Sequence, residues 1–134
     1  MIKTNSTGSF VKTFPSESGN VDETHWVPNT DVWVAESGLV IKVELAGMRR
    51  EDLELTAEGN RLRIHGQRVD GCRAGKCTFI LMEINYGSFE SVIDIPPGFD
   101  LSKAKAVYQN GFLRIDIPHI DSSTSKKIPI RNGE

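Results

Sequence analysis

The chain has 134 residues, of which 38% are hydrophobic and 25% are charged, and its formal net charge at pH 7 is −2. This composition is that of an ordinary globular domain that can bury a core. The small negative charge argues against a protein that binds nucleic acid or anionic lipid, because either role needs a basic surface. No apolar stretch approaches the ~20 residues that cross a bilayer, and the first residues lack the apolar core of a secretion signal. We therefore expect a cytoplasmic protein.

Residues 1–25 are mostly Ser, Thr, Asn, Gly and charged residues, with one small apolar cluster formed by Phe10, Val11 and Phe14. Phe10 and Phe14 have the spacing of one helical turn, but a single turn is too short to be stable alone. The segment is therefore either a solvated arm or a contact arm that orders on binding. We expect a flexible N-terminal arm.

From Trp26 onward, apolar residues alternate with polar ones, which is typical of antiparallel strands with one buried and one solvated face. Turn signals such as Glu58-Gly59-Asn60 and Asn110-Gly111 separate these strands. Short strands at regular intervals predict an all-β fold, an immunoglobulin-like antiparallel β-sandwich. The apolar sets are Val32 and Val34; Ile41, Val43 and Leu45; Leu53 and Leu55; Leu62 and Ile64; Phe89, Ile93 and Ile95; and Leu113, Ile115 and Ile117.

One long segment, Arg68 to Tyr86, interrupts the regular spacing and carries its own apolar run, Thr78 to Ile84. Loops of this length in a compact domain usually have a function. The run either folds back as an edge strand of its own sheet or, as we favour, reaches out to pair with a neighbouring subunit. Cys72 and Cys77 in the same segment are either free thiols, a reversible disulfide, or zinc ligands together with His65.

The last motif of the chain is Ile128-Pro129-Ile130, which a polar segment from Asp121 to Lys127 separates from the last predicted strand. In an extended backbone, two isoleucines at this spacing project from the same face. Pro129 between them fixes φ and has no backbone donor. We interpret the motif as a two-pronged plug for a groove at a sheet edge of another subunit. This interpretation favours assembly over catalysis.

In order and spacing, these motifs resemble the α-crystallin domain of the small heat shock proteins, the Hsp20 family. The resemblance runs from Trp26 to Pro118 and includes the tail. The segment Arg61 to Arg68 is similar to the family's nxLxIxGxR strand, and Ile128-Pro129-Ile130 to its I-x-I motif. Two positions depart from the pattern, because Ser91 and Ile84 stand where the family commonly has arginine. The first of those arginines takes part in charge pairing around the family's dimer interface.

The resemblance implies an arm at residues 1–25, an α-crystallin domain at 26–120 and a tail at 121–134. It implies a dimer that exchanges a strand, and a higher oligomer in which the isoleucines of the tail bind a groove on another dimer. The strand-exchange residues are Phe79, Ile80, Leu81, Met82 and Glu83. The groove residues are Leu53, Leu55, Ala106 and Tyr108.

The activity that the resemblance implies is that of an ATP-independent holdase chaperone, which binds unfolding proteins and suppresses their aggregation. Phe10, Val11 and Phe14 would contact these clients. We expect no catalytic residue, cofactor, metal, nucleic acid or membrane partner, because the histidines are scattered and no nucleophile elbow is present. The alternative is a p23/CS-like co-chaperone or binding module. Such a module lacks the I-x-I tail and the strand-bearing loop, and is a monomer.

Overall fold

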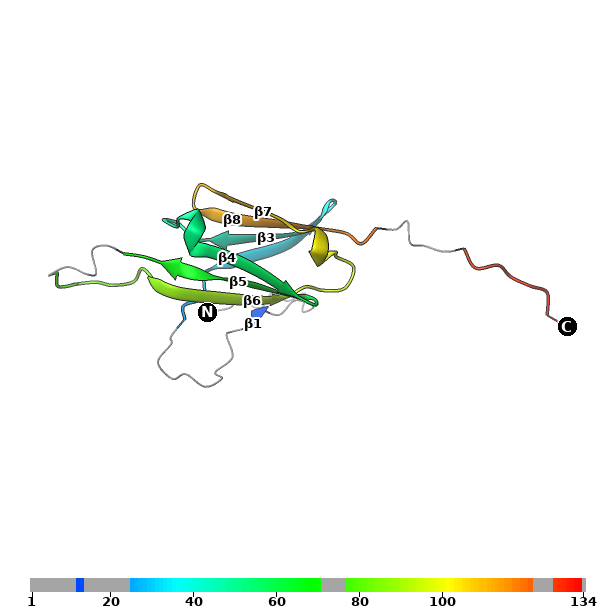
Figure 1. Cartoon of the computed structure of the whole chain (residues 1–134), viewed down its shortest axis with the longest axis horizontal. Helices are drawn as coiled ribbons and strands as arrows, with labels where there is room; N and C mark the ends of the chain where they lie inside the picture. Colours follow the sequence, from blue (N-terminus) through cyan, green and yellow to red (C-terminus); the bar gives the residue numbers. More distant parts are fainter. Residues whose placement is uncertain (1–11, 14–24, 71–76, 122–126, 134) are drawn as a thin grey trace.

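A computed structural model describes residues 12–13, 25–70, 77–121 and 127–133. Two four-stranded antiparallel sheets pack face to face (Figure 1), with strand orders β1-β6-β5-β4 and β2-β3-β8-β7. The predicted all-β sandwich is confirmed. Among the described residues, the strands are β1 (Lys12–Thr13), β2 (Thr30–Ala35), β3 (Gly38–Glu44), β4 (Leu53–Glu58), β5 (Arg61–Arg68), β6 (Gly87–Asp94), β7 (Lys105–Gln109) and β8 (Phe112–Pro118), and the short 3-10 helices are η1 (Arg50–Asp52) and η3 (Leu101–Lys103).

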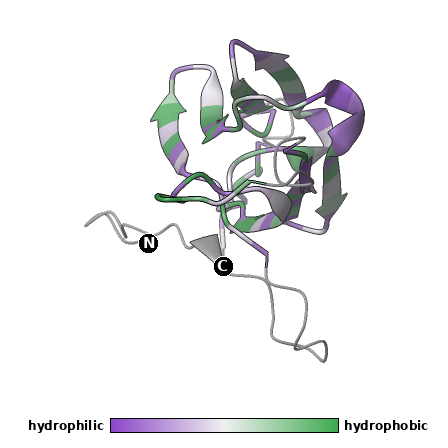
Figure 2. Cartoon of the chain, turned by 90° about the vertical axis from the view of Figure 1, so that its left-hand side faces the viewer, coloured by the Kyte–Doolittle hydropathy of each residue, from purple (hydrophilic) through white to green (hydrophobic). Residues whose placement is uncertain are grey.

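The core lies between the sheets and is built from the apolar faces that the alternation predicts. Figure 2 shows this alternation as bands of opposite hydropathy along the strands. Val34 is an exception, because it is 63% exposed near the end of the edge strand β2. The core residues are Leu39, Ile41, Val43, Leu45, Met48, Leu62, Ile64, Phe89, Ile93, Ile95, Leu113, Ile115 and Ile117.

Two predicted hairpin turns position the edge strands β7 and β4. Asn110 and Gly111 join β7 to β8 with φ angles of 54° and 81°. Positive φ at both positions is what a type I′ turn requires, and this turn type matches the twist of the paired strands. The resulting register places Ala106 opposite Ile115. The turn at Gly59 and Asn60 likewise joins β4 to β5.

The N-terminal segment contributes a short strand that the sequence did not predict. In β1, Lys12 pairs with Ile93 and Thr13 pairs with Val92 of β6. The edge of β6 would otherwise carry unpaired backbone groups, which readily recruit another strand. The predicted client-contact residues Phe10, Val11 and Phe14 lie outside the described residues.

Backbone hydrogen bonds close the sandwich at both ends of the predicted domain. The Trp26 amide donates to the Ser88 carbonyl at 3.2 Å, and the Ile120 amide donates to the Gly98 carbonyl at 2.9 Å. In the parts of the chain that the structure describes, no helix is long and apolar enough to cross a membrane.

Candidate functional site: a groove, a tail and an apolar loop

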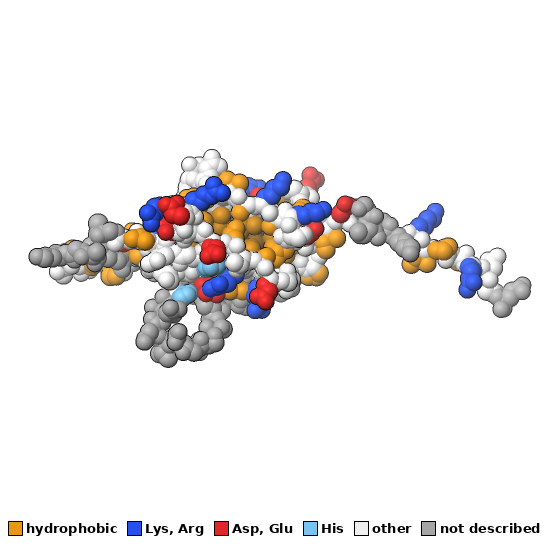
Figure 3. All heavy atoms as spheres, in the orientation of Figure 1, with side chains coloured by type: hydrophobic (Ala, Val, Ile, Leu, Met, Phe, Trp, Pro, Cys, Tyr) orange, Lys and Arg blue, Asp and Glu red, His pale blue; other side chains and the backbone are white. Residues whose placement is uncertain are grey.

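A groove opens between β4 and β7, the edge strands at the same side of the two sheets. It has a volume of about 150 Å³ and reaches the core residues Leu62 and Ile115, which are only 3% and 1% exposed. Hydrophobic side chains gather between these strands and charged side chains surround them (Figure 3). The groove can therefore accept aliphatic side chains. Its lining residues are Leu55, Thr56, Ala57, Leu62, Leu101, Ala104, Lys105, Ala106 and Ile115.

Of the four residues predicted to form this groove, Leu55 and Ala106 line it, and Leu53 and Tyr108 do not. Leu53 and Tyr108 pack, partly buried, against the core. The Tyr108 hydroxyl donates to the Leu45 carbonyl at 2.7 Å and accepts from the Met48 amide at 3.2 Å. This pair of bonds makes Tyr108 a support for the turn after β3.

Sequence reasoning missed several groove residues because they are small or lie outside the strands. Ala57 continues the inward face of β4, but alanine gives a weak apolar signal. Leu101 and Ala104 belong to η3 and its C-cap, a region without period-two alternation. The alternation of β4 and the position of η3 before β7 are the only signals that could have found them.

The tail motif lies in the solvent. Ile128 is 81% exposed and Ile130 is 96% exposed, and residues 127–133 extend away from the sandwich (Figure 1). The groove and the tail of one chain therefore do not meet. Both are open to a second copy.

The predicted strand-exchange segment forms no strand within the described part of the chain. Residues 77–86 lie beyond the end of the sandwich where β5 ends and β6 begins (Figure 1). The fold-back alternative is therefore not what this structure has, and pairing with a neighbour stays a prediction. Most of its apolar side chains are exposed: Phe79 by 45%, Ile80 by 102%, Leu81 by 72%, Met82 by 57% and Ile84 by 63%.

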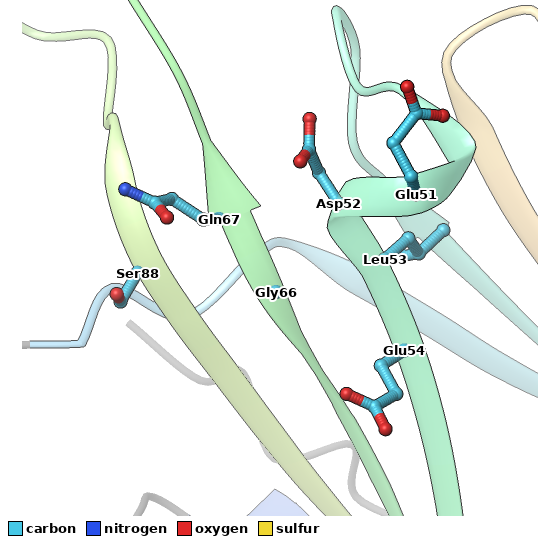
Figure 4. A pocket seen from close by; sticks show the side chains of 7 residues that line it. All are labelled: Glu51, Asp52, Leu53, Glu54, Gly66, Gln67 and Ser88. Atoms are coloured by element: carbon cyan, nitrogen blue, oxygen red, sulfur yellow. The ribbon is translucent and has the colours of Figure 1, made fainter.

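A second hollow, of about 320 Å³, lies beside η1 and the start of β4, and it is acidic. Glu51, Asp52 and Glu54 line it, but the carboxylate of Glu54 points away from the side to which those of Glu51 and Asp52 point (Figure 4). Arg49 also pairs with Asp52 at 2.8 Å. Among the described residues there is no cluster of three His, Cys, Asp or Glu side chains that could hold a metal ion. Cys72, one of the proposed thiols, lies outside those residues.

Comparison with known proteins identifies the family. The model of the Hsp20/alpha crystallin family matches residues 31–131. The chain belongs to this family. It is 29% identical over 119 residues to Small heat shock protein C2 of Rickettsia felis, covering 89% of this chain and 76% of the relative. It is 32% identical over 103 residues to Small heat shock protein C4 of the same organism, covering 77% and 63%.

The solved structures agree with this assignment. A small heat-shock protein from Xylella fastidiosa, whose crystal structure is described as revealing a distinct high order structure, is 28% identical, with a TM-score of 0.70. The alignment covers 81% of this chain and 100% of that one. Heat shock protein 16.0 from Schizosaccharomyces pombe is 27% identical with a TM-score of 0.65, covering 84% and 80%. The small heat shock proteins are chaperones, which are not enzymes.

Ser91, which stands where the Hsp20 family commonly has arginine, is fully buried on the core face of β6. Its hydroxyl has no hydrogen-bond partner among the described residues, so the residue brings neither charge nor a polar contact to an interface. The charges of β6 lie on the opposite face. There Glu90 pairs with Arg63 at 3.0 Å and Asp94 pairs with Arg61 at 2.9 Å. The hydrogen bond to Glu90 raises the pKa of the Arg63 guanidinium.

Proposed function

We propose that this chain is an ATP-independent holdase chaperone, which works as a dynamic homo-oligomer of dimers and binds unfolding proteins. The observation that carries the proposal is that one copy exposes both an apolar tail and an apolar groove, which do not contact each other. Its two tail isoleucines are exposed, and its apolar groove between β4 and β7 is open to the core. We take the tail of a second copy as the occupant of that groove.

The tail contact is weak singly and strong when repeated. Burial of two isoleucine side chains contributes roughly 3–6 kcal/mol gross. Ordering the tail and losing the freedom of a subunit offset much of this energy. In a closed oligomer each further contact is nearly intramolecular, so many weak contacts hold together. An assembly built in this way exchanges subunits and loosens on heating.

The length of the tail allows it to leave its own subunit. The polar segment from Asp121 to Lys127 spans at most about 23–25 Å when fully extended. This reach is enough for an adjacent dimer. We propose that the arm comprises residues 1–25, the domain residues 26–120 and the tail residues 121–134.

Dimers would form through the exposed segment Phe79 to Glu83. The acceptor we propose is β2, the edge strand at the other side of the second sheet. We do not assign β4 or β7 as the acceptor, because they flank the groove assigned to the tail. The strand β2 exposes Val34 by 63% and Trp33 by 40%. An added strand there would satisfy backbone groups and cover these side chains.

Client proteins would bind to apolar surface that the assembly exposes when contacts open. Candidates are the groove itself after a tail leaves and the arm residues Phe10, Val11 and Phe14. Capture of unfolded chains lowers the concentration that is free to aggregate. No nucleotide enters this scheme.

Light scattering of heated citrate synthase, with and without this protein and without ATP, tests the proposal. We expect suppression of aggregation at a near-stoichiometric ratio of subunits to client. An equal mass of an unrelated soluble protein serves as the control. Unchanged scattering, together with a monomeric native mass, would reject the holdase and favour a p23/CS-like module.

A further inference from the structure

Arg68, the last residue of β5, joins three segments that are far apart in the sequence. Its Nε donates to the Asn85 carbonyl at 2.8 Å, and its Nη1 donates to the Ala46 carbonyl at 3.2 Å. Its guanidinium also lies over the Trp26 ring, 4.3 Å from the ring centroid, and faces the Tyr86 ring at 5.3 Å. We call these contacts the Arg68 clamp.

The clamp closes the base of the long segment that leaves the sandwich. Arg68 stands where this segment begins, and Asn85 and Tyr86 stand where it returns to β6. The Trp26 ring is held in turn, because its Nε1 donates to the Gly87 carbonyl at 3.2 Å. Arg68 therefore contacts both the returning stem and Trp26, which lies shortly before β2 in the sequence.

This connection has a consequence for a two-fold dimer. In such a dimer each copy lends its apolar segment to the partner and receives the partner's segment in return. If β2 is the acceptor, each copy carries donor and acceptor together. The placement of the donor stem relative to β2 within one copy then sets the register of both exchanges. Arg68 adds to this placement, alongside the backbone bonds between Trp26 and β6.

We infer that Arg68 is a positioning residue for subunit exchange, which holds the stem of segment 77–86 against the lead-in to β2. This inference rests on the proposed strand-exchange dimer. The chemistry calls for arginine, because a planar guanidinium can donate to two carbonyls and stack on aromatic rings together. Lysine keeps the charge near the rings, but its ammonium is a compact point charge on a flexible stem and cannot reproduce the planar fork.

The rate of subunit exchange tests the inference in the full chain. Unlabelled and ¹⁵N-labelled protein are mixed, and native mass spectrometry follows the formation of dimers of mixed mass. We expect Arg68→Ala to raise the exchange rate about tenfold, the effect of losing one charge-assisted hydrogen bond. Arg68→Lys should fall between Arg68→Ala and wild type. Arg61→Ala on the same strand is the matched control, because it removes an exposed ion pair outside the clamp.

Two further measurements separate the possible failures. If Arg68→Ala does not fold, Arg68→Lys carries the test and must still accelerate exchange. An exchange rate for both Arg68 variants equal to that of Arg61→Ala would overturn the clamp. Leu81→Asp in the exchange segment then decides how far the failure extends. If Leu81→Asp abolishes the dimer, the proposal of a strand-exchange dimer stands and only the role of the clamp is rejected. If Leu81→Asp leaves the dimer unaffected, both proposals are rejected.

Discussion

Removal of the two tail prongs, by Ile128→Ala together with Ile130→Ala, should reduce the assembly to dimers. In the free chain these side chains are 81% and 96% exposed, so docking would bury almost their whole apolar surface. Each substitution deletes three carbon atoms, worth about 0.8 kcal/mol per buried CH₂, or about 2 kcal/mol per isoleucine. The pair therefore loses about 4–5 kcal/mol, which weakens a single tail contact by roughly three orders of magnitude.

Sedimentation velocity measures the native mass of wild type and variant over a range of protein concentrations. We expect a large wild-type species and a variant that sediments as a dimer at every concentration. Because neither isoleucine contributes to the core, the midpoint of thermal unfolding of the variant dimer should stay close to that of a wild-type dimer dissociated by dilution.

The matched control is Ile120→Ala. This isoleucine is also exposed, by 54%, but it lies before the polar segment and outside the tail motif. It should leave the native mass unchanged. If the tail variant keeps the wild-type mass, or if Ile120→Ala lowers the mass equally, the plug mechanism is wrong.

The remaining predictions concern the groove and the core. Ala106→Arg should also produce dimers on sedimentation, because a charge would occupy the apolar groove. Val107→Arg, on the opposite face of β7, should retain the large assembly. If both substitutions reduce the native mass equally, the tail does not bind in this groove. Ser91→Ala should raise the free energy of unfolding in a urea titration by about 1 kcal/mol, because it removes a buried hydroxyl that has no partner in the described part of the chain. Ser88→Ala, exposed on the same strand, should change it little; a destabilised Ser91→Ala would show that the hydroxyl has a partner.

The strands of the sandwich were predictable because apolar residues recur at every second position along most of their length. Ile41 and Val43, like Ile115 and Ile117, are all 1% exposed or less. A strand with one buried face needs this period of two, and the turn residues between strands give its ends. Val34 follows the same rule in sequence but lies near the end of the edge strand β2, where its side chain is 63% exposed.

Other features depend on contacts that no local pattern encodes. Its residue type alone would place Ser91 on the solvated face, yet the register of β6 places it in the core between Phe89 and Ile93. Arg68 reads as one more charged residue on a strand, although its partners lie up to 42 positions away, at Trp26.

The apolar run at Phe79–Glu83 predicted a strand, but a strand needs a partner edge. The described residues of one copy do not supply such an edge to this run. Of the groove residues that the resemblance implied, Leu55 and Ala106 line the hollow between β4 and β7, whereas Leu53 and Tyr108, two positions away on the same strands, pack against the core. Family motifs give the strands that flank a groove, but local twist and packing decide which side chains line it.

A photo-cross-linking amino acid at position 130, in a mixture of unlabelled and ¹⁵N-labelled chains, tests most directly whether the tail of one copy occupies the groove of another. Mass spectrometry of the cross-linked peptides gives both the contact site and the copy from which each peptide came. We predict cross-links between differently labelled chains, to the peptides that contain Leu55 of β4 and Ala106 of β7. Cross-links confined to a single chain, or to surfaces away from these two strands, would contradict the proposed assembly.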